Sequence, residues 1–186
     1  FHPDGSLAAI VGLEAHGRVW DLRTGRCEFS LVGHAKQCLA IDFAPNGYEC
    51  VTGAGDHAAR VWDLRRRECV YVVPAHAKLV SGVRYEPTTG GFFVTSSHDG
   101  SLGAWSARDF SKVATLRGHE SAVMGADVAP GGGTVASVGY DRTLKLWRRG
   151  EGAERGARFH SKSLMWLTLE SLGAYGGFAR SEKTFS

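Results

Sequence analysis

Three sets of polar residues in this chain combine side chains that can carry out acid–base or nucleophilic chemistry. Each set holds a histidine, a threonine or serine, an aspartate and a tryptophan. The hydroxyl residue precedes the aspartate by 4 positions and the tryptophan by 10, and the histidine precedes the aspartate by 22 or 23. The sets are His34–Thr52–Asp56–Trp62, His76–Thr95–Asp99–Trp105 and His119–Ser137–Asp141–Trp147.

A histidine, a hydroxyl and an aspartate are also the components of a hydrolase triad. An active site occurs once in a chain, however, and these residues recur three times at one spacing. We therefore interpret the sets as structural, and predict no catalytic residue and no enzyme activity. Three histidines 42 or 43 residues apart could also suggest a metal site, but they fall in separate repeats, so we predict none.

The tryptophans show that the sets belong to a repeat. Trp20, Trp62, Trp105 and Trp147 follow one another at 42 or 43 residues, a period typical of WD40 repeats, in which each propeller blade has about four short strands. In WD40 blades the histidine bridges the aspartate to the hydroxyl, and the hydroxyl meets the indole N–H. The first repeat departs from this pattern, because Ile10 stands in the hydroxyl position and Glu14 in the aspartate position.

The stretches between the sets indicate an all-β fold. Short runs that alternate polar and apolar residues are separated by turns rich in Gly, Asp and Asn, as expected for antiparallel sheets. We predict a partial WD40 β-propeller of about three and a half blades over residues 1–149, and a divergent tail over 150–186 that is disordered, artefactual, a short helix or a strand. The expected strands are 38–43, 48–53, 59–63, 69–73, 80–85, 92–96, 102–105, 112–116, 123–128, 134–138 and 144–147.

Composition excludes several other classes of protein. The net charge of +3 is too small to indicate nucleic-acid binding by itself. The sequence has no apolar run long enough for a transmembrane helix and no signal-peptide pattern at Phe1. The four cysteines lack metal-site spacing, and we expect them to be buried free thiols.

Several motifs resemble the WD40 subunits of the U4/U6 small nuclear ribonucleoprotein (snRNP). The most specific is Cys69-Val70-Tyr71 followed by Pro74-Ala75-His76. The resemblance covers about residues 1–147, and its other motifs are 16–27, 43–48, 61–65, 118–120, 123–125, 140–143 and 145–147. It implies a seven-bladed propeller, of which this chain is the C-terminal part, and a non-catalytic scaffold in pre-mRNA splicing. It further implies a nuclear location, other U4/U6 snRNP proteins and a cyclophilin as partners, and a place in the U4/U6·U5 tri-snRNP.

An alternative function is that of another WD40 adaptor, such as a ubiquitin-ligase receptor or a trafficking subunit. For either function we predict no cofactor, no small-molecule substrate and no membrane contact. Contact with U4/U6 RNA is expected to be mostly indirect, with Arg65, Arg66 and Arg67 as the best basic cluster. Loop residues near the histidines and before the aspartates are candidates for binding partner proteins, or alternatively pack the central channel: Gln37, Leu39, Leu79, Ser81, His98, Met124 and Tyr140.

Overall fold

A computed structural model describes residues 1–149 and 159–164 of the chain. These residues form fifteen β-strands and no helix. Every pair of neighbouring strands is antiparallel. The prediction of an all-β chain is confirmed. Because the described residues contain no helix, none of them forms a helix that could cross a membrane.

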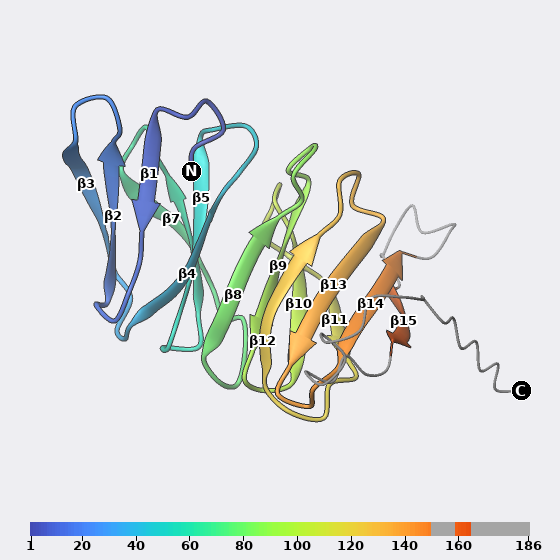
Figure 1. The fold of residues 1–186 in the computed structure, drawn as a ribbon. Coiled ribbons are helices and arrows are strands. Elements are labelled where there is room, and N and C mark those ends of the chain that lie inside the picture. The colour runs from blue at the N-terminus through green and yellow to red at the C-terminus, as the bar shows by residue number, and fades with distance from the viewer. Residues whose placement is uncertain (150–158, 165–186) are drawn as a thin grey trace, which may run out of the picture.

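The strands are grouped into four sheets that follow one another in chain order (Figure 1). The first sheet has three strands and the other three have four each. This arrangement is that of a partial propeller in which each sheet is one blade. The first sheet is β1 (Leu7–Ile10), β2 (His16–Asp21) and β3 (Arg26–Val32). The second is β4 (Cys38–Phe43), β5 (Glu49–Ala54), β6 (Ala59–Asp63) and β7 (Glu68–Val73). The third is β8 (Val80–Tyr85), β9 (Phe92–Ser97), β10 (Ser101–Ser106) and β11 (Lys112–Arg117). The fourth is β12 (Val123–Val128), β13 (Thr134–Gly139), β14 (Leu144–Arg149) and β15 (Phe159–Leu164).

Strand β15 lies within the stretch that the sequence assigns to the tail. It pairs with β14 from Leu144↔Leu164 to Arg149↔Phe159 and is the outer strand of the fourth sheet. The rest of the tail, for which the sequence analysis left disorder, an artefact, a short helix or a strand open, lies outside the described residues at 150–158 and 165–186. The division of the chain at residue 149 therefore stays a prediction.

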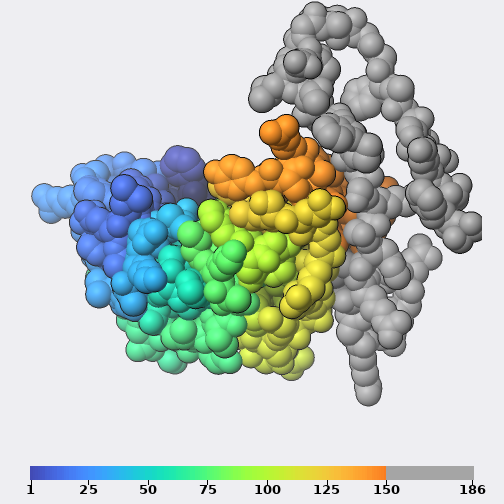
Figure 2. Space-filling model, turned by 90° about the horizontal axis from the view of Figure 1, so that it is seen from below, coloured from blue at the N-terminus to red at the C-terminus, as the bar shows by residue number. Residues whose placement is uncertain are grey.

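The hydrophobic core lies between neighbouring sheets. Alternate residues of a strand point to opposite faces, and so each middle strand serves two interfaces. On β5, Cys50 packs with Val19 and Leu31 of the first sheet, whereas Val51 packs with Val83 of the third. On β9, Phe93 packs in the interface between the second and third sheets, with Val51 and Val83, and Val94 packs towards the fourth sheet. Period-2 alternation with apolar residues on both faces is therefore what stacks these sheets side by side (Figure 2).

Hydrogen bonds fix the inner strands β4, β8 and β12 next to one another. The Tyr85 amide donates to the Asp42 carboxylate at 2.7 Å, and the Ser81 hydroxyl donates to the Val123 carbonyl at 2.6 Å. Both bonds join a sheet to the next one along the chain.

The cysteines differ in part from the prediction. All four are free thiols, and Cys38 and Cys50 are buried. Cys69 is half-buried, and Cys27 is exposed. Cys27 lies on the outer strand β3, and an outer strand has no further strand to cover it.

Candidate functional site

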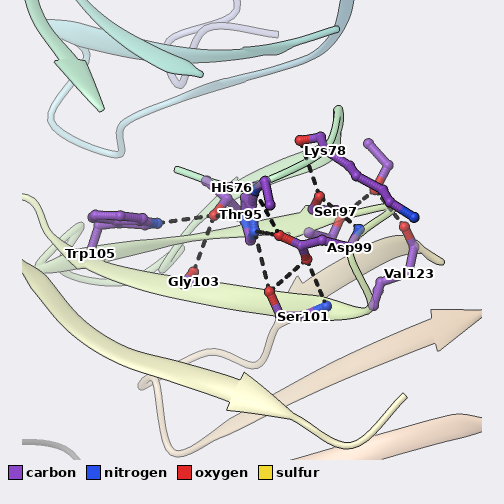
Figure 3. Close-up of polar contacts among 12 residues, drawn as sticks. His76, Lys78, Thr95, Ser97, Asp99, Ser101, Gly103, Trp105 and Val123 are labelled. Carbon is purple, nitrogen blue, oxygen red and sulfur yellow. Dashed lines mark hydrogen bonds and ion pairs between the residues drawn. The ribbon is translucent and has the colours of Figure 1, made fainter. Parts of the chain in front are cut away.

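The structure joins each four-residue set into one hydrogen-bonded network. Each histidine Nδ1 lies 2.8–3.0 Å from its aspartate Oδ2, and each Nε2 lies 2.7–2.8 Å from its Thr or Ser hydroxyl. Each tryptophan Nε1–H donates to the same hydroxyl oxygen at 2.9–3.0 Å. We call each such set a tetrad, and Figure 3 shows the one in the third sheet.

The members of a tetrad come from four parts of a blade. The histidine lies in the loop that leads from the previous sheet, and the hydroxyl residue lies on the second strand. The aspartate follows that strand in a turn, and the tryptophan lies on the third strand. The tetrad therefore ties together the loop, the turn and two strands.

The aspartate also accepts hydrogen bonds from two backbone amides. In the third sheet, Asp99 Oδ2 accepts from the Ala77 amide of the histidine loop at 3.1 Å, and Oδ1 accepts from the Ser101 amide at 2.9 Å. Asp56 and Asp141 make the same pair of bonds in their sheets. The carboxylate thus closes its own turn and holds the loop beside it.

The ionisation of the third-sheet tetrad follows from its surroundings. Burial alone would raise the pKa of Asp99, but hydrogen bonds from Ser101 and Ala77 and the charge of His76 outweigh burial and lower the pKa to about 2. Burial lowers the pKa of His76 below its usual 6.5, although Asp99 opposes this shift. At neutral pH the carboxylate is therefore ionised and the imidazole neutral.

A neutral imidazole has one donor and one acceptor nitrogen, which fixes the direction of every bond. In the tetrads of His34 and His76, whose pKa values burial lowers, Nδ1–H donates to the carboxylate, the hydroxyl donates to Nε2, and the indole N–H donates to the hydroxyl oxygen. The hydroxyls are not accessible as nucleophiles, because Thr52 and Thr95 are 0% exposed and Ser137 is 1% exposed. The arrangement satisfies buried polar groups and offers no attacking group to a substrate.

Sequence reasoning missed one member of the network in two of the three blades. The hydroxyls of Ser101 and Thr143 donate to Oδ1 of Asp99 and Asp141 at 2.6 and 2.7 Å. The second sheet has Ala58 at this position. A hydroxyl residue two positions after the aspartate was the signal that could have revealed this contact.

The first sheet contains no tetrad among the described residues. Ile10 is 60% exposed, and the Glu14 carboxylate lies 2.7 Å from Arg18 and 3.0 Å from His16. Trp20 is half-buried. The positions that hold a buried network in the other blades here carry an exposed side chain and a surface ion pair.

The structure brings together two of the seven residues predicted to bind partners. His98 and Tyr140 come from neighbouring sheets, and their rings meet edge to face at 6.4 Å. Tyr140 is 65% exposed and Met124 is 40% exposed. Ser81 instead uses its hydroxyl between β8 and β12. Gln37, Leu39 and Leu79 are half-buried. The Gln37 carbonyl accepts a hydrogen bond from the Gly55 amide, and the Leu79 carbonyl accepts one from the His98 amide.

The basic cluster is largely paired with acidic residues. Arg65 lies 3.4 Å from Asp63, Arg66 lies 3.5 Å from Glu68, and Arg67 lies 3.6 Å from Glu28. These neighbours reduce the positive potential of the turn.

No metal site is evident in residues 1–149 and 159–164, since no three His, Cys, Asp or Glu side chains there are placed to hold an ion. The histidines of the tetrads lie in separate blades.

Repeated blades held by such tetrads define a WD-repeat protein. The family model "WD domain, G-beta repeat" matches residues 25–63, 67–106 and 110–148, and the chain belongs to this family. No enzymatic family is indicated by this match.

Relatives with different descriptions resemble the chain. A "U4/U6 small nuclear ribonucleoprotein PRP4-like protein" of Arabidopsis thaliana is 49% identical over 62 residues, which are 33% of this chain and 11% of the relative. The "Nuclear distribution protein PAC1" of Arthroderma benhamiae is 27% identical over 157 residues, 79% of this chain and 34% of the relative. A "U3 snoRNP-associated protein-like" protein of Arabidopsis thaliana is 35% identical over 115 residues, 62% of this chain and 24% of the relative. The chain thus spans about a third or less of the length of these relatives.

Proposed function

We propose that this chain is part of a non-catalytic nuclear scaffold in pre-mRNA splicing, a component of the U4/U6 snRNP and the U4/U6·U5 tri-snRNP. The observation that carries the proposal is the 49% identity to the U4/U6 snRNP protein over 62 residues. That level of identity is well above the 27% found for the nuclear distribution protein. Its partners would be other U4/U6 snRNP proteins and a cyclophilin.

The surface chemistry supports binding to proteins more than to RNA. Exposed Tyr140 and Met124, with His98 beside Tyr140, offer the aromatic and thioether groups that are enriched in protein interfaces. The three arginines of the basic turn each have an acidic neighbour. We therefore propose that association with U4/U6 RNA is mostly indirect.

Affinity purification from nuclear extract tests the proposal, with the longest available form of the protein as bait. Splicing proteins and U4/U6 RNA are expected to co-purify. Reversing the charges of Arg65, Arg66 and Arg67 should leave the RNA largely in place. Recovery of bait without either U4/U6 RNA or splicing proteins would contradict the proposal.

A pair of substitutions locates the protein contact. His98→Ala with Tyr140→Ala should reduce the recovery of partner proteins without unfolding the blade, because neither residue belongs to a tetrad. Tyr71→Ala is the matched control, since Tyr71 is 43% exposed and also stacks on an aromatic neighbour, Phe110, at 5.1 Å. Equal losses in both variants would argue against a specific surface at His98 and Tyr140.

The second candidate function is that of another WD40 adaptor. The match to the nuclear distribution protein favours it, because that match covers 79% of this chain. This function predicts ubiquitin-ligase, coat or other adaptor complexes in the same purification, and no small nuclear RNA.

A further inference from the structure

One blade position breaks a charge pattern that the other blades share. The residue two positions before the tryptophan is Arg18 in the first sheet, Arg60 in the second and Lys145 in the fourth. In the third sheet it is Gly103. This position lies on the third strand, in register with the tetrad hydroxyl residue of the second strand.

The third sheet also differs from the second and fourth in the residue before the tetrad histidine. The residue before the tetrad histidine is Gly33 in the second sheet and Gly118 in the fourth, but it is Ala75 in the third. A Cβ at Gly33 would lie 3.3 Å from Trp62 Cη2 and 3.0 Å from the Arg60 guanidinium, and a Cβ at Gly118 would lie 3.1 Å from Trp147 Cη2. The methyl of Ala75 would therefore crowd a tryptophan placed as in these two blades, and one of the two groups would have to shift by a few tenths of an ångström.

Trp105 accordingly lies closer to its own strand. A Cβ at Gly103 would lie only 2.6 Å from Trp105 Nε1, a separation that real Cβ atoms do not show. Arg60 and Lys145 carry that carbon, so the indole rings of their blades must lie farther from the strand. Trp105 still donates to Thr95 at 3.0 Å (Figure 3), and the Lys112 ammonium lies 4.7 Å above its ring.

A cavity of about 250 Å³ lies beside Gly103, on the strand position where the other blades carry a long side chain. Its floor is one face of the β10–β11 pair, where Ser101 is opposite Arg117, Gly103 opposite Thr115 and Trp105 opposite Lys112. The histidine loop, with Ala75, His76 and Ala77, lines the other side.

The charge of this cavity is set by the outer strand. Lys112 and Arg117 line it, whereas the corresponding outer-strand residues of the second sheet are the neutral Cys69 and Pro74. Neither Lys112 nor Arg117 forms an ion pair within the described residues. Lys112 makes the cation–π contact with Trp105. The one carboxylate in the lining, that of Asp99, already accepts hydrogen bonds from His76, Ser101 and the Ala77 amide.

We propose that this cavity is a binding site for an anionic group, and that its occupant is an acidic side chain of a protein bound to the propeller. Lys112 and Arg117 would form charge-assisted hydrogen bonds to the anion, with the Thr115 hydroxyl between them. The choice of a protein occupant rests on the proposed scaffold function. The anion site itself does not, since it can be tested without any partner.

Alanine methyl NMR tests the site in the longest soluble form of the protein that contains this chain. Sodium phosphate, sodium succinate and arginine chloride are titrated separately at constant ionic strength and pH 7. At least one anion is expected to shift the methyl signals of Ala75 and Ala77 saturably, and arginine to leave them unchanged. Ala35 is the matched control, because it holds the place of Ala77 beside Asp56 in the second sheet. A stronger response to succinate indicates a carboxylate side chain, and a stronger response to phosphate indicates a phosphorylated one.

Two sets of variants test which side chains bind the anion and whether Ala75 and Gly103 together determine the position of Trp105. Lys112→Gln with Arg117→Gln should weaken anion binding about tenfold or more while leaving the fold intact. Gly103→Arg alone should lower the Tm, because its Cβ meets Trp105, and added Ala75→Gly should restore the Tm by letting the ring move back. The double variant Ala75→Gly, Gly103→Arg should then fold but bind no anion.

Three results would overturn the proposal. They are methyl shifts that do not saturate, equal shifts with arginine, and unchanged binding in the Lys112 and Arg117 variant. A double variant no more stable than Gly103→Arg would refute the explanation by repacking. None of these results bears on whether U4/U6 RNA co-purifies with the protein.

Discussion

The first blade and the next three are all antiparallel sheets, with three strands in the first and four in each of the others, but they differ in their polar interior. The first sheet buries Val19 and Leu31 against the second, and it forms its strands without a tetrad. The other three sheets each have a loop, a turn and two strands tied by one buried network. Apolar packing is therefore sufficient for the sheet, and the tetrad adds the connection between the sheet and the loop that enters it.

Removal of a tetrad aspartate should separate the two kinds of blade most clearly. Asp56→Ala, Asp99→Ala and Asp141→Ala should each lower the free energy of unfolding by about 1–3 kcal/mol, because each leaves a buried histidine N–H without an acceptor. Glu14→Ala, the matched change in the first blade, should cost less than about 0.5 kcal/mol, since the contacts of the Glu14 carboxylate with Arg18 and His16 lie at the surface. Denaturant unfolding measures both. Equal costs at Glu14 and at the three aspartates would remove the distinction between the blades.

Replacement of tryptophan by phenylalanine should also cost more in a blade with a tetrad than in the first blade, with a smaller difference in the free energy of unfolding. Trp62→Phe removes a buried hydrogen bond to Thr52 and should cost about 1 kcal/mol beyond the loss of ring area. Trp20→Phe should cost less, because Trp20 is half-buried and none of the described residues accepts a hydrogen bond from its indole. The comparison is made by denaturant unfolding of the two variants. A larger cost for Trp20→Phe would show that the first blade depends on its tryptophan in some other way.

The strands and the tetrads could be predicted from the sequence because both have fixed spacing. The predicted strands agree with the structure to within one or two residues; the strand expected at 48–53, for example, is β5 at Glu49–Ala54. The position of Trp105 could not be predicted, because it depends on the methyl of Ala75 and the missing side chain of Gly103, which are 28 residues apart in sequence. The exposure of Cys27 was missed because the alternation of apolar residues does not show which strand lies at the outer edge.

Acid should weaken the second and third blades through His34 and His76. Burial holds the pKa of His34 and His76 below the usual 6.5, so the unfolded chain binds protons more readily than the folded chain. Stability is therefore complete above pH 6.5 and is lost progressively as the pH falls below it. Below about pH 4, protonation of Asp99 and Asp141, whose folded pKa is about 2, continues the loss.

Unfolding free energies measured at intervals from pH 7.5 to pH 5 check this expectation. The variant His34→Gln, which has no proton to gain at that position, should show a shallower decline than the parent. A parent protein with constant stability across this range would contradict the expected role of the histidines. Burial raises the pKa values of Asp42 and Glu49, so these carboxyls act in the opposite direction as the pH falls, and the comparison with His34→Gln isolates the contribution of the histidine.

The smallest effect is expected where tetrad residues are placed in the first blade. Ile10→Thr with Glu14→Asp supplies the missing hydroxyl and carboxylate, but the histidine that contacts Glu14, His16, lies on β2 and not in a loop that enters the sheet. Ile10 is 60% exposed, so little buried area is lost, and the ion pair of Glu14 with Arg18 is on the surface. The free energy of unfolding should change by less than about 0.5 kcal/mol. A stabilisation above 1 kcal/mol would mean that a hydroxyl and a carboxylate form the network without histidine. A loss of similar size would mean that Ile10 or Glu14 supports the blade in its own right. A change near zero would show that the histidine loop is the part of the tetrad that the other members cannot replace.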